Sequence, residues 1–218
     1  MTERGLFITV EGGEGAGKTT ALDYLERALT DAGVAVVRTR EPGGTAMAEK
    51  LRDLLLHAED VSIDPLAELL LIFASRAQHL RERIRPALAA GHWVLCDRFT
   101  DASYAYQGAG RGLGAETVAT LERFVQGDQQ PDLTLLIDVP VEVGMERARG
   151  RGSLDRFESE DLAFFQRVRS CYLDRAAKSS GRFRVIDGCR SIAEVQRSLA
   201  DVIAQLLRVD RHASPPVP

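Results

Sequence analysis

The chain has 218 residues, of which 44% are hydrophobic and 28% charged, and a formal net charge of −4. This length suits a single domain with a substantial core, and the acidic balance argues against a nucleic acid as a partner. The sequence contains no run of about 18 apolar residues, so we expect no membrane-spanning helix, and we expect no signal peptide. The three cysteines are widely spaced and odd in number, so we expect free thiols in a reducing cytoplasm.

Short apolar runs rich in branched residues alternate along the chain with longer amphipathic segments. The runs predict strands buried on both faces of a parallel sheet, and they span residues 6–10, 34–37, 93–96, 133–137 and 183–186. The amphipathic segments predict helices at residues 20–32, 67–90, 115–126 and 162–178. This alternation predicts an α/β domain whose sheet has helices on both faces, although it leaves the order of the strands open.

No linker or internal repeat marks a domain boundary, so residues 1–207 are predicted to form one domain. Two segments depart from the alternation. Residues 146–158 (ERARGRGSLDRFE) are too basic and too interrupted by glycine for a packed element, and we expect them to form a short lid. Residues 208–218 (RVDRHASPPVP) are polar and proline-rich, which predicts a flexible C-terminal tail.

The first predicted strand leads directly into residues 12–19 (GGEGAGKT), which match the phosphate-loop pattern G-x-x-x-x-G-K-S/T. In this pattern glycines let backbone N–H groups face an anion, the lysine reaches the β- and γ-phosphates, and the hydroxyl binds Mg²⁺. The N-terminus of the following helix adds positive potential. The loop therefore predicts a P-loop NTPase fold and a nucleoside triphosphate with Mg²⁺, bound by Gly12, Gly13, Glu14, Gly15, Ala16, Gly17, Lys18, Thr19 and Thr20.

GTPases, ATPases and small-molecule kinases share this loop, so the acceptor must be inferred from other residues. Open α/β sheets bind ligands past the carboxyl ends of their strands. After the second predicted strand, residues 40–45 (REPGGT) form a rigid turn. After the third, Asp97 lies where an acidic residue positions Mg²⁺, and Arg98 is a forked donor suited to a second phosphate. A structural ion pair between Asp97 and Arg98 is the alternative.

Aromatic and amide side chains follow this motif. Tyr104, Tyr106 and Gln107 could sandwich and read a planar ring, although two tyrosines could equally pack in the core. Earlier in the chain, Arg76 lies in a long helical pattern. An arginine is difficult to bury without a partner, and a solvated helix face is the alternative.

The lid segment contains Arg147, Arg149, Arg151 and Arg156. Phosphoryl transfer spreads negative charge over the equatorial oxygens, so an arginine inserted by a lid would stabilise the transition state while the lid excludes water. A solvated basic loop is the alternative. No histidine lies in these motifs. A phosphate monoester acceptor fits, because its second pKa of about 6 leaves it largely dianionic, whereas Asp97 could act as the base for a hydroxyl acceptor.

Taken together, these segments resemble the thymidylate kinases over residues 7–207. The motifs that carry the resemblance are EGGEGAGKTT, REPGGT, DRFTDASYAYQGAGRGL and LDRFE. The resemblance implies phosphorylation of thymidine 5′-monophosphate (dTMP) to the diphosphate, with ATP as donor, Mg²⁺ as cofactor and a homodimer as the assembly. It also implies the bacterial type, in which Gly15 follows the loop carboxylate and lid arginines supply catalysis.

The resemblance also implies a role for individual residues. Those implied to be catalytic are Lys18, Arg98 and a lid arginine, with Arg151 preferred over Arg149 and Arg156. Arg147 is implied to cover the adenine of ATP. Thr19 and Asp97 are implied to hold Mg²⁺, partly through water.

For the acceptor, the residues implied to bind dTMP are Glu14, Glu41, Pro42, Phe73, Arg76, Arg98, Ser103, Tyr104 and Gln107. Arg76 would donate to the thymine carbonyl, and Tyr104 would wall the deoxyribose. Many relatives place a ring-stacking phenylalanine four residues before the arginine equivalent to Arg76. Here Ile72 occupies that position, and Phe73 follows about 100° further round a helix.

Two other functions remain open. The first is another small-molecule P-loop kinase, acting on a different nucleoside monophosphate or on a deoxynucleoside, which a panel of acceptors would distinguish. The second is a nucleotide-gated switch protein, which predicts acceptor-independent hydrolysis and a protein partner. The DRF and SYAYQ segments, for which a switch has no obvious need, favour the kinase.

Overall fold

The computed structural model describes residues 4–57, 62–150, 156–157 and 160–213, with the side chains of the last helix described through Arg208. Within these residues, five parallel strands form one sheet in the order β2-β3-β1-β4-β5. The strands are β1 (Phe7–Glu11), β2 (Val36–Arg40), β3 (Trp93–Asp97), β4 (Leu133–Asp138) and β5 (Phe183–Asp187). Every apolar run predicted to be a strand overlaps one, and the predicted parallel α/β fold is confirmed. The edge strands β2 and β5 are only partly buried, so burial on both faces holds for the inner strands alone.

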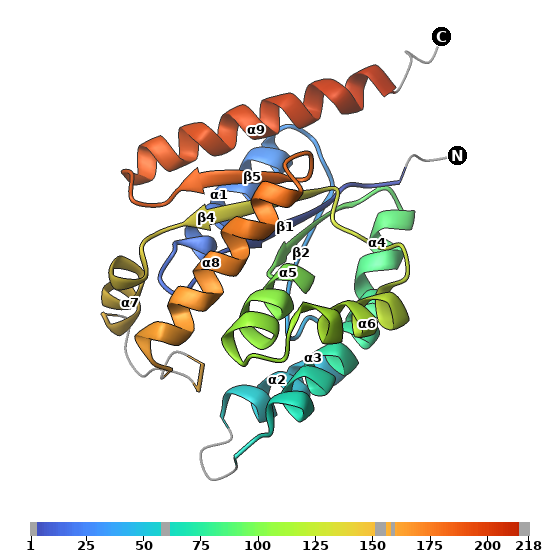
Figure 1. Ribbon diagram of the computed structural model, residues 1–218. Helices are drawn as coiled ribbons and strands as arrows, with labels where there is room; N and C mark the ends of the chain where they lie inside the picture. The colour runs from blue at the N-terminus through green and yellow to red at the C-terminus, as the bar shows by residue number, and fades with distance from the viewer. Residues whose placement is uncertain (1–3, 58–61, 151–155, 158–159, 214–218) are drawn as a thin grey trace.

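Helices cover both faces of the sheet (Figure 1). On one face lie α1 (Lys18–Asp31) and α9 (Ile192–Ala213). The other face is covered by η1 (Leu80–Ile84), α4 (Arg85–Ala89), η2 (Tyr104–Gly110) and α8 (Leu162–Lys178), of which η1 and η2 are π-helical. The remaining helices pack on these or on one another, and they are α2 (Ala46–Leu56), α3 (Pro65–His79), α5 (Thr100–Ser103), α6 (Ala115–Gln126) and α7 (Val141–Arg149).

The central strand β1 is apolar on both sides because helices cover it on both sides. Successive side chains of a strand point to opposite faces. Phe7 accordingly packs with the cluster of η1 and α4, whereas Ile8 and Val10 pack with α1 and α9. All five of its residues are buried, including Glu11 at its carboxyl end. The uninterrupted apolar run in the sequence is thus the consequence of a two-sided core.

The helix predicted at residues 67–90 is built from three consecutive pieces, α3, η1 and α4. It begins earlier than predicted, because Pro65 is well tolerated in a first turn and the Asp64 carboxylate caps the helix. That carboxylate accepts the N–H groups of Leu66 and Ala67, at 2.9 and 3.3 Å. The π-helical η1 then continues the rod into α4.

The prediction that residues 146–158 contain no packed element is wrong for their first part. Helix α7 runs from Val141 to Arg149 and therefore includes two of the lid arginines. Its buried side chains include Val141, Met145 and Ala148, which recur at the helical spacing, so the basic residues between them can remain exposed. The helical spacing of the buried residues therefore determines the structure of this segment, despite its basic composition.

The C-terminal helix α9 continues to Ala213, past residue 207, where the sequence places the start of a flexible tail. The polar residues 208–213 include no glycine or proline, and the first proline is Pro215, so nothing in their sequence ends the helix earlier. Residues 214–218 of the predicted tail lie outside the described part of the chain. Among the described residues, no helix is both long and apolar enough to cross a membrane.

Candidate active site

The phosphate loop connects β1 to α1 as predicted. Gly17 caps α1 with a φ of 96°, and Gly15 has a φ of 65°. A Cβ atom at Gly15 would lie 2.0 Å from the carbonyl oxygen of Gly144, so α7 packs directly on the loop and only glycine fits there. The Lys18 ammonium folds back over the loop and donates to the carbonyl oxygens of Gly12 and Gly13, at 3.2 and 2.9 Å.

A cavity of about 250 Å³ opens beside this loop, beyond the carboxyl ends of the central strands. We call it the acceptor cavity, because most of the residues predicted to bind the acceptor line it. The predicted site residues that it brings together are Glu14, Lys18, Thr19, Glu41, Pro42, Arg76, Asp97, Arg98, Ser103 and Gln107. Segments far apart in the sequence therefore meet at one edge of the sheet, as the rule for open α/β sheets requires.

Cations gather around the Glu14 carboxylate at the mouth of the loop. Arg98 donates to Glu14 at 2.5 Å, and the Tyr106 hydroxyl donates to the same oxygen at 2.9 Å. Burial alone would raise the pKa of Glu14, but the charges of Arg98 and Lys18 dominate and lower it to about 2. The Arg98 guanidinium also lies 4.5 Å from the centre of the Tyr106 ring. Lys18 and Arg98 thus flank the Glu14 carboxylate at this end of the cavity.

The backbone of Arg98 is held in a strained conformation. Its φ of 66° is the one positive value among the described non-glycine residues. The next amide, that of Phe99, donates to the buried Glu11 carboxylate at 2.7 Å, and the Tyr172 hydroxyl donates to the other oxygen of Glu11 at 2.8 Å. Burial and the nearby Asp101 carboxylate raise the pKa of Glu11 to about 7. Glu11 therefore fixes the turn that aims Arg98 at the cavity.

At the opposite end of the cavity, Arg76 is 1% exposed and held from two sides. Its Nε donates to Glu41 at 2.7 Å, and one terminal nitrogen donates to the Ser103 hydroxyl at 2.9 Å. Among the described residues, the other terminal nitrogen, Nη1, has no partner. Glu41 is fixed in turn by His79, at 3.0 Å. The buried arginine therefore keeps one donor for a ligand, because an unpaired buried N–H group is costly.

Two predicted acceptor residues do not line the cavity. Phe73 is buried with Leu69 and Val118 in a separate cluster and supports the Arg76 guanidinium from 4.5 Å, while Ile72 forms the cavity wall. The step of about 100° between neighbouring helical residues is the reason. Tyr104 belongs to the same buried cluster and donates its hydroxyl to Glu122 on α6, away from the cavity.

Sequence reasoning missed several residues of the cavity. Tyr106 lines the cavity and Tyr104 does not, although both tyrosines are aromatic candidates in the sequence. Arg52 adds a fourth cation beside Lys18, Arg76 and Arg98, and its guanidinium donates to the carbonyl oxygen of Pro42 at 2.9 Å. Burial, followed by the charges of Arg40 and other neighbours, lowers the pKa of Arg52. No signal pointed to Arg52, because α2 itself was not predicted. Phe157 completes the apolar wall.

The residues present fit a magnesium ion held mainly by phosphates. The buried Oδ1 atom of Asp97 has no hydrogen-bond partner among the described residues, and Asp97 and Thr19 line the same cavity. No group of three or more His, Cys, Asp or Glu side chains in the described part of the chain could hold a metal alone. Mg²⁺ is commonly bound through one or two protein oxygens, water and substrate phosphates.

A second cavity, of about 320 Å³, lies on the other side of the phosphate loop, and we call it the donor cavity. Its walls include Gly15, Ala16, Gly17 and Thr20 of the loop and its helix, together with Arg147, Gly188, Arg190 and Gln196. Arg147 donates to the carbonyl oxygen of Gly188 at 3.0 Å. The predicted adenine residue Arg147 thus lies at this cavity, whereas Arg190 and Gln196 were not predicted.

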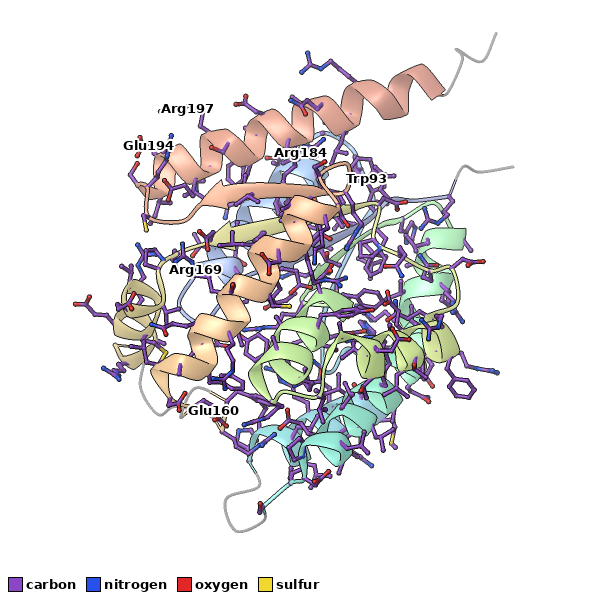
Figure 2. All side chains as sticks on the ribbon, viewed as in Figure 1. Trp93, Glu160, Arg169, Arg184, Glu194 and Arg197 are labelled. Atoms are coloured by element: carbon purple, nitrogen blue, oxygen red, sulfur yellow. The ribbon has the colours of Figure 1, made fainter. Side chains whose placement is uncertain are left out.

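The lid arginines occupy different places. Arg149 is exposed in the last turn of α7, and Arg151 lies outside the described residues. Arg156 donates to the carbonyl oxygen of Leu55 at 2.8 Å and to Glu68 at 2.6 Å, so the end of the lid segment contacts α2 and α3. Glu160, labelled near the start of α8 in Figure 2, pairs with Arg111 beside this contact.

A phosphate loop between two cavities, both with arginines in their walls, is typical of a P-loop phosphotransferase. A model of the thymidylate kinase family matches residues 10–199. The thymidylate kinase of Pseudomonas syringae pv. tomato is 59% identical over 207 residues, 95% of this chain and 99% of that protein. The thymidylate kinase of Pseudomonas putida (strain GB-1) is 60% identical over 195 residues, 89% of this chain and 93% of that protein.

The crystal structure of thymidylate kinase from Ehrlichia chaffeensis is also similar, with a TM-score of 0.75 and 36% identity over 92% of this chain and 99% of that chain. The chain belongs to the thymidylate kinase family. The predicted family, P-loop fold and kinase activity on dTMP are confirmed.

Proposed function

We propose that the acceptor cavity binds dTMP, that the donor cavity binds the base of ATP, and that the γ-phosphoryl group passes between them over Lys18 and Arg98. The carrying observation is that one loop lines both cavities: Glu14 and Lys18 face the first, and Gly15 to Gly17 face the second. A phosphate bound on the loop would therefore lie beside a phosphate bound by Arg98. In-line transfer needs this proximity.

Positively charged side chains would recognise the phosphate of the acceptor. Arg98, with Arg52 beside it, would bind the phosphate of dTMP, and the guanidinium would exchange part of its contact with Glu14 for this phosphate. A dianionic phosphate oxygen would attack the γ-phosphorus while the bridging oxygen leaves with ADP, so no general base is needed. At the far end, Arg76, Ser103 and Gln107 would contact the thymine.

Mg²⁺ would be held by Asp97 and Thr19, partly through water. When bound, the ion neutralises charge on the β- and γ-phosphates and orients them. Lys18 would leave the carbonyl oxygens of the loop and take up the phosphates. Its pKa is lowered by burial and by the charge of Arg98, and the loop carboxylate Glu14 partly offsets these effects.

A lid arginine would stabilise the transition state. We propose Arg151 for this role, with Arg149 and Arg156 as alternatives, and Arg147 as the residue that covers the adenine. Support for the lid comes from α7, which carries Arg147 and Arg149 and packs on the phosphate loop through Gly144.

We also propose a homodimer in the cytoplasm. Large apolar side chains are exposed on α3 and on α2 and α6, which both pack against α3, and they are Met47, Leu54, Leu66, Leu70 and Phe124. An apolar surface of this kind suits contact with a second copy. The cysteines at 96, 171 and 189 are all free thiols, which suits a reducing compartment.

An acceptor panel tests the function. The purified chain with ATP and Mg²⁺ is given dTMP, dUMP, other nucleoside monophosphates and thymidine in turn, and release of ADP is measured. We expect the highest kcat/KM with dTMP and some turnover of dUMP, because one methyl group is worth about 1–3 kcal/mol. If the enzyme turned over another acceptor preferentially, that acceptor and not dTMP would be its substrate. Hydrolysis that does not depend on an acceptor would indicate a switch protein.

A further inference from the structure

Behind the acceptor cavity, one buried carboxylate on α3 accepts from three side chains that belong to two other parts of the chain. Glu68 is 0% exposed and is not among the residues that line the cavity. It accepts a hydrogen bond from the Gln107 side-chain amide nitrogen at 2.8 Å. It also forms ion pairs with Arg111, at 3.3 Å, and with Arg156, at 2.6 Å.

We propose that Glu68 is a specificity-determining positioning residue that selects the acceptor base by fixing the side-chain amide of Gln107. A carboxylate in two ion pairs accepts hydrogen bonds and donates none. The amide must therefore turn its NH₂ group toward Glu68, whichever way it would otherwise rotate. Because Gln107 lines the cavity, its carbonyl oxygen is the end left for a ligand.

The fixed amide matches one kind of pyrimidine edge. Arg76 lines the same cavity and has an unpartnered Nη1 donor among the described residues, so the wall would present one donor and one acceptor to a ligand. Thymine and uracil carry a carbonyl acceptor, O4, beside the N3–H donor. Cytosine carries an amino donor beside an N3 acceptor and is therefore mismatched at both positions. This inference rests on the proposed binding of dTMP in the acceptor cavity.

Glu68→Gln tests the proposal. Arg111 and Arg156 can only donate hydrogen bonds, so they decide which end of the new amide faces them. The new side chain would turn its carbonyl oxygen to Arg111 and Arg156 and its NH₂ group to Gln107. The Gln107 amide would then rotate and present NH₂ to the cavity, which removes the mismatch with N3 of cytosine and creates one with N3–H of thymine. Sites that lose a matched hydrogen bond discriminate strongly, so we expect the ratio of kcat/KM for dTMP to that for dCMP to fall at least about tenfold.

Glu68→Asp is the matched control, since it keeps a carboxylate that can only accept. We expect this variant to retain the preference for dTMP even if its overall activity falls. The ratio of two acceptors cancels any loss of active protein, so a purely structural role of Glu68 would lower both rates and leave the ratio unchanged. A folded Glu68→Gln variant with the wild-type ratio would overturn the proposal.

A measurement on the unmutated enzyme covers the case in which Glu68→Gln does not fold. The side-chain NH₂ signals of Gln107, assigned by their loss in Gln107→Glu, should exchange slowly with solvent in the free protein because they face a buried carboxylate. Rapid exchange would overturn the proposal. If the unmutated enzyme phosphorylates dTMP and dCMP equally, the inference fails and the kinase function stands. If it phosphorylates neither, the proposed function itself fails.

Discussion

Replacing Glu11 with glutamine should change how the stability of the protein depends on pH. Burial and the Asp101 carboxylate raise the pKa of Glu11 from 4.5 to about 7. Between these values the folded protein keeps a proton that the unfolded chain has released, so the free energy of unfolding falls as the pH rises. The loss is complete above the folded pKa. Glutamine does not ionise and should not show this dependence.

The size of the effect follows from the two pKa values. At about 1.4 kcal/mol for each pH unit between them, the full loss is about 3 kcal/mol, of which about 2.5 kcal/mol falls between pH 5 and pH 8. The contacts of the side chain should survive, because the glutamine oxygen can accept from the Phe99 N–H and its NH₂ group can donate to the Tyr172 oxygen. The structural cost of Glu11→Gln should therefore be nearly independent of pH.

Chemical denaturation at pH 5 and pH 8 measures this difference. Trp93, the single tryptophan, is 4% exposed and provides the fluorescence signal (Figure 2). We expect Glu11→Gln to gain about 2.5 kcal/mol relative to the unmutated protein between the two pH values. Glu116→Gln, at an exposed position on α6, is the control and should give a constant difference. A constant difference for Glu11→Gln as well would refute the assigned pKa.

Three further substitutions test the site and the assembly. Lys18→Ala should lower kcat by about 10³-fold while circular dichroism reports an intact fold, and a retained rate would remove Lys18 from the mechanism. Arg98→Ala should weaken dTMP binding by about 10- to 100-fold, measured by calorimetry, and leave ATP binding nearly unchanged. Phe124→Ser should shift the chain toward monomer in sedimentation experiments, because this side chain is 87% exposed in the single chain; an unchanged assembly would place the interface elsewhere.

The parts of the fold that the sequence predicts are those with a local physical cause. Strands buried on both faces are mostly apolar, and the phosphate loop needs glycine where α7 approaches Gly15. The order of the strands has no such cause. β1 lies between β3 and β4 only because the crossover helices divide between the two faces of the sheet, which no single segment encodes.

The exchange of Tyr104 for Tyr106 in the acceptor cavity has a similar origin. Residues 104–110 form the π-helical η2, whose hydrogen bonds span five residues instead of four, so side chains are distributed differently from those of an α-helix. Tyr106 and Gln107 consequently reach the cavity, while Tyr104 faces α6. The aromatic motif identifies a segment that lines the cavity, but the helix type decides which tyrosine does so.

The sequence identifies the arginines of the site but not the direction of their guanidinium groups, because carboxylate partners set that direction. Arg76 is held by Glu41, Arg98 by Glu14 and Arg156 by Glu68. Each carboxylate comes from an earlier, distant part of the chain, so the pairs exist only after the sheet has formed. Because a buried guanidinium must be paired, each carboxylate also decides which N–H groups remain for a ligand. The pattern of free donors is therefore a property of the acidic residues as much as of the arginines.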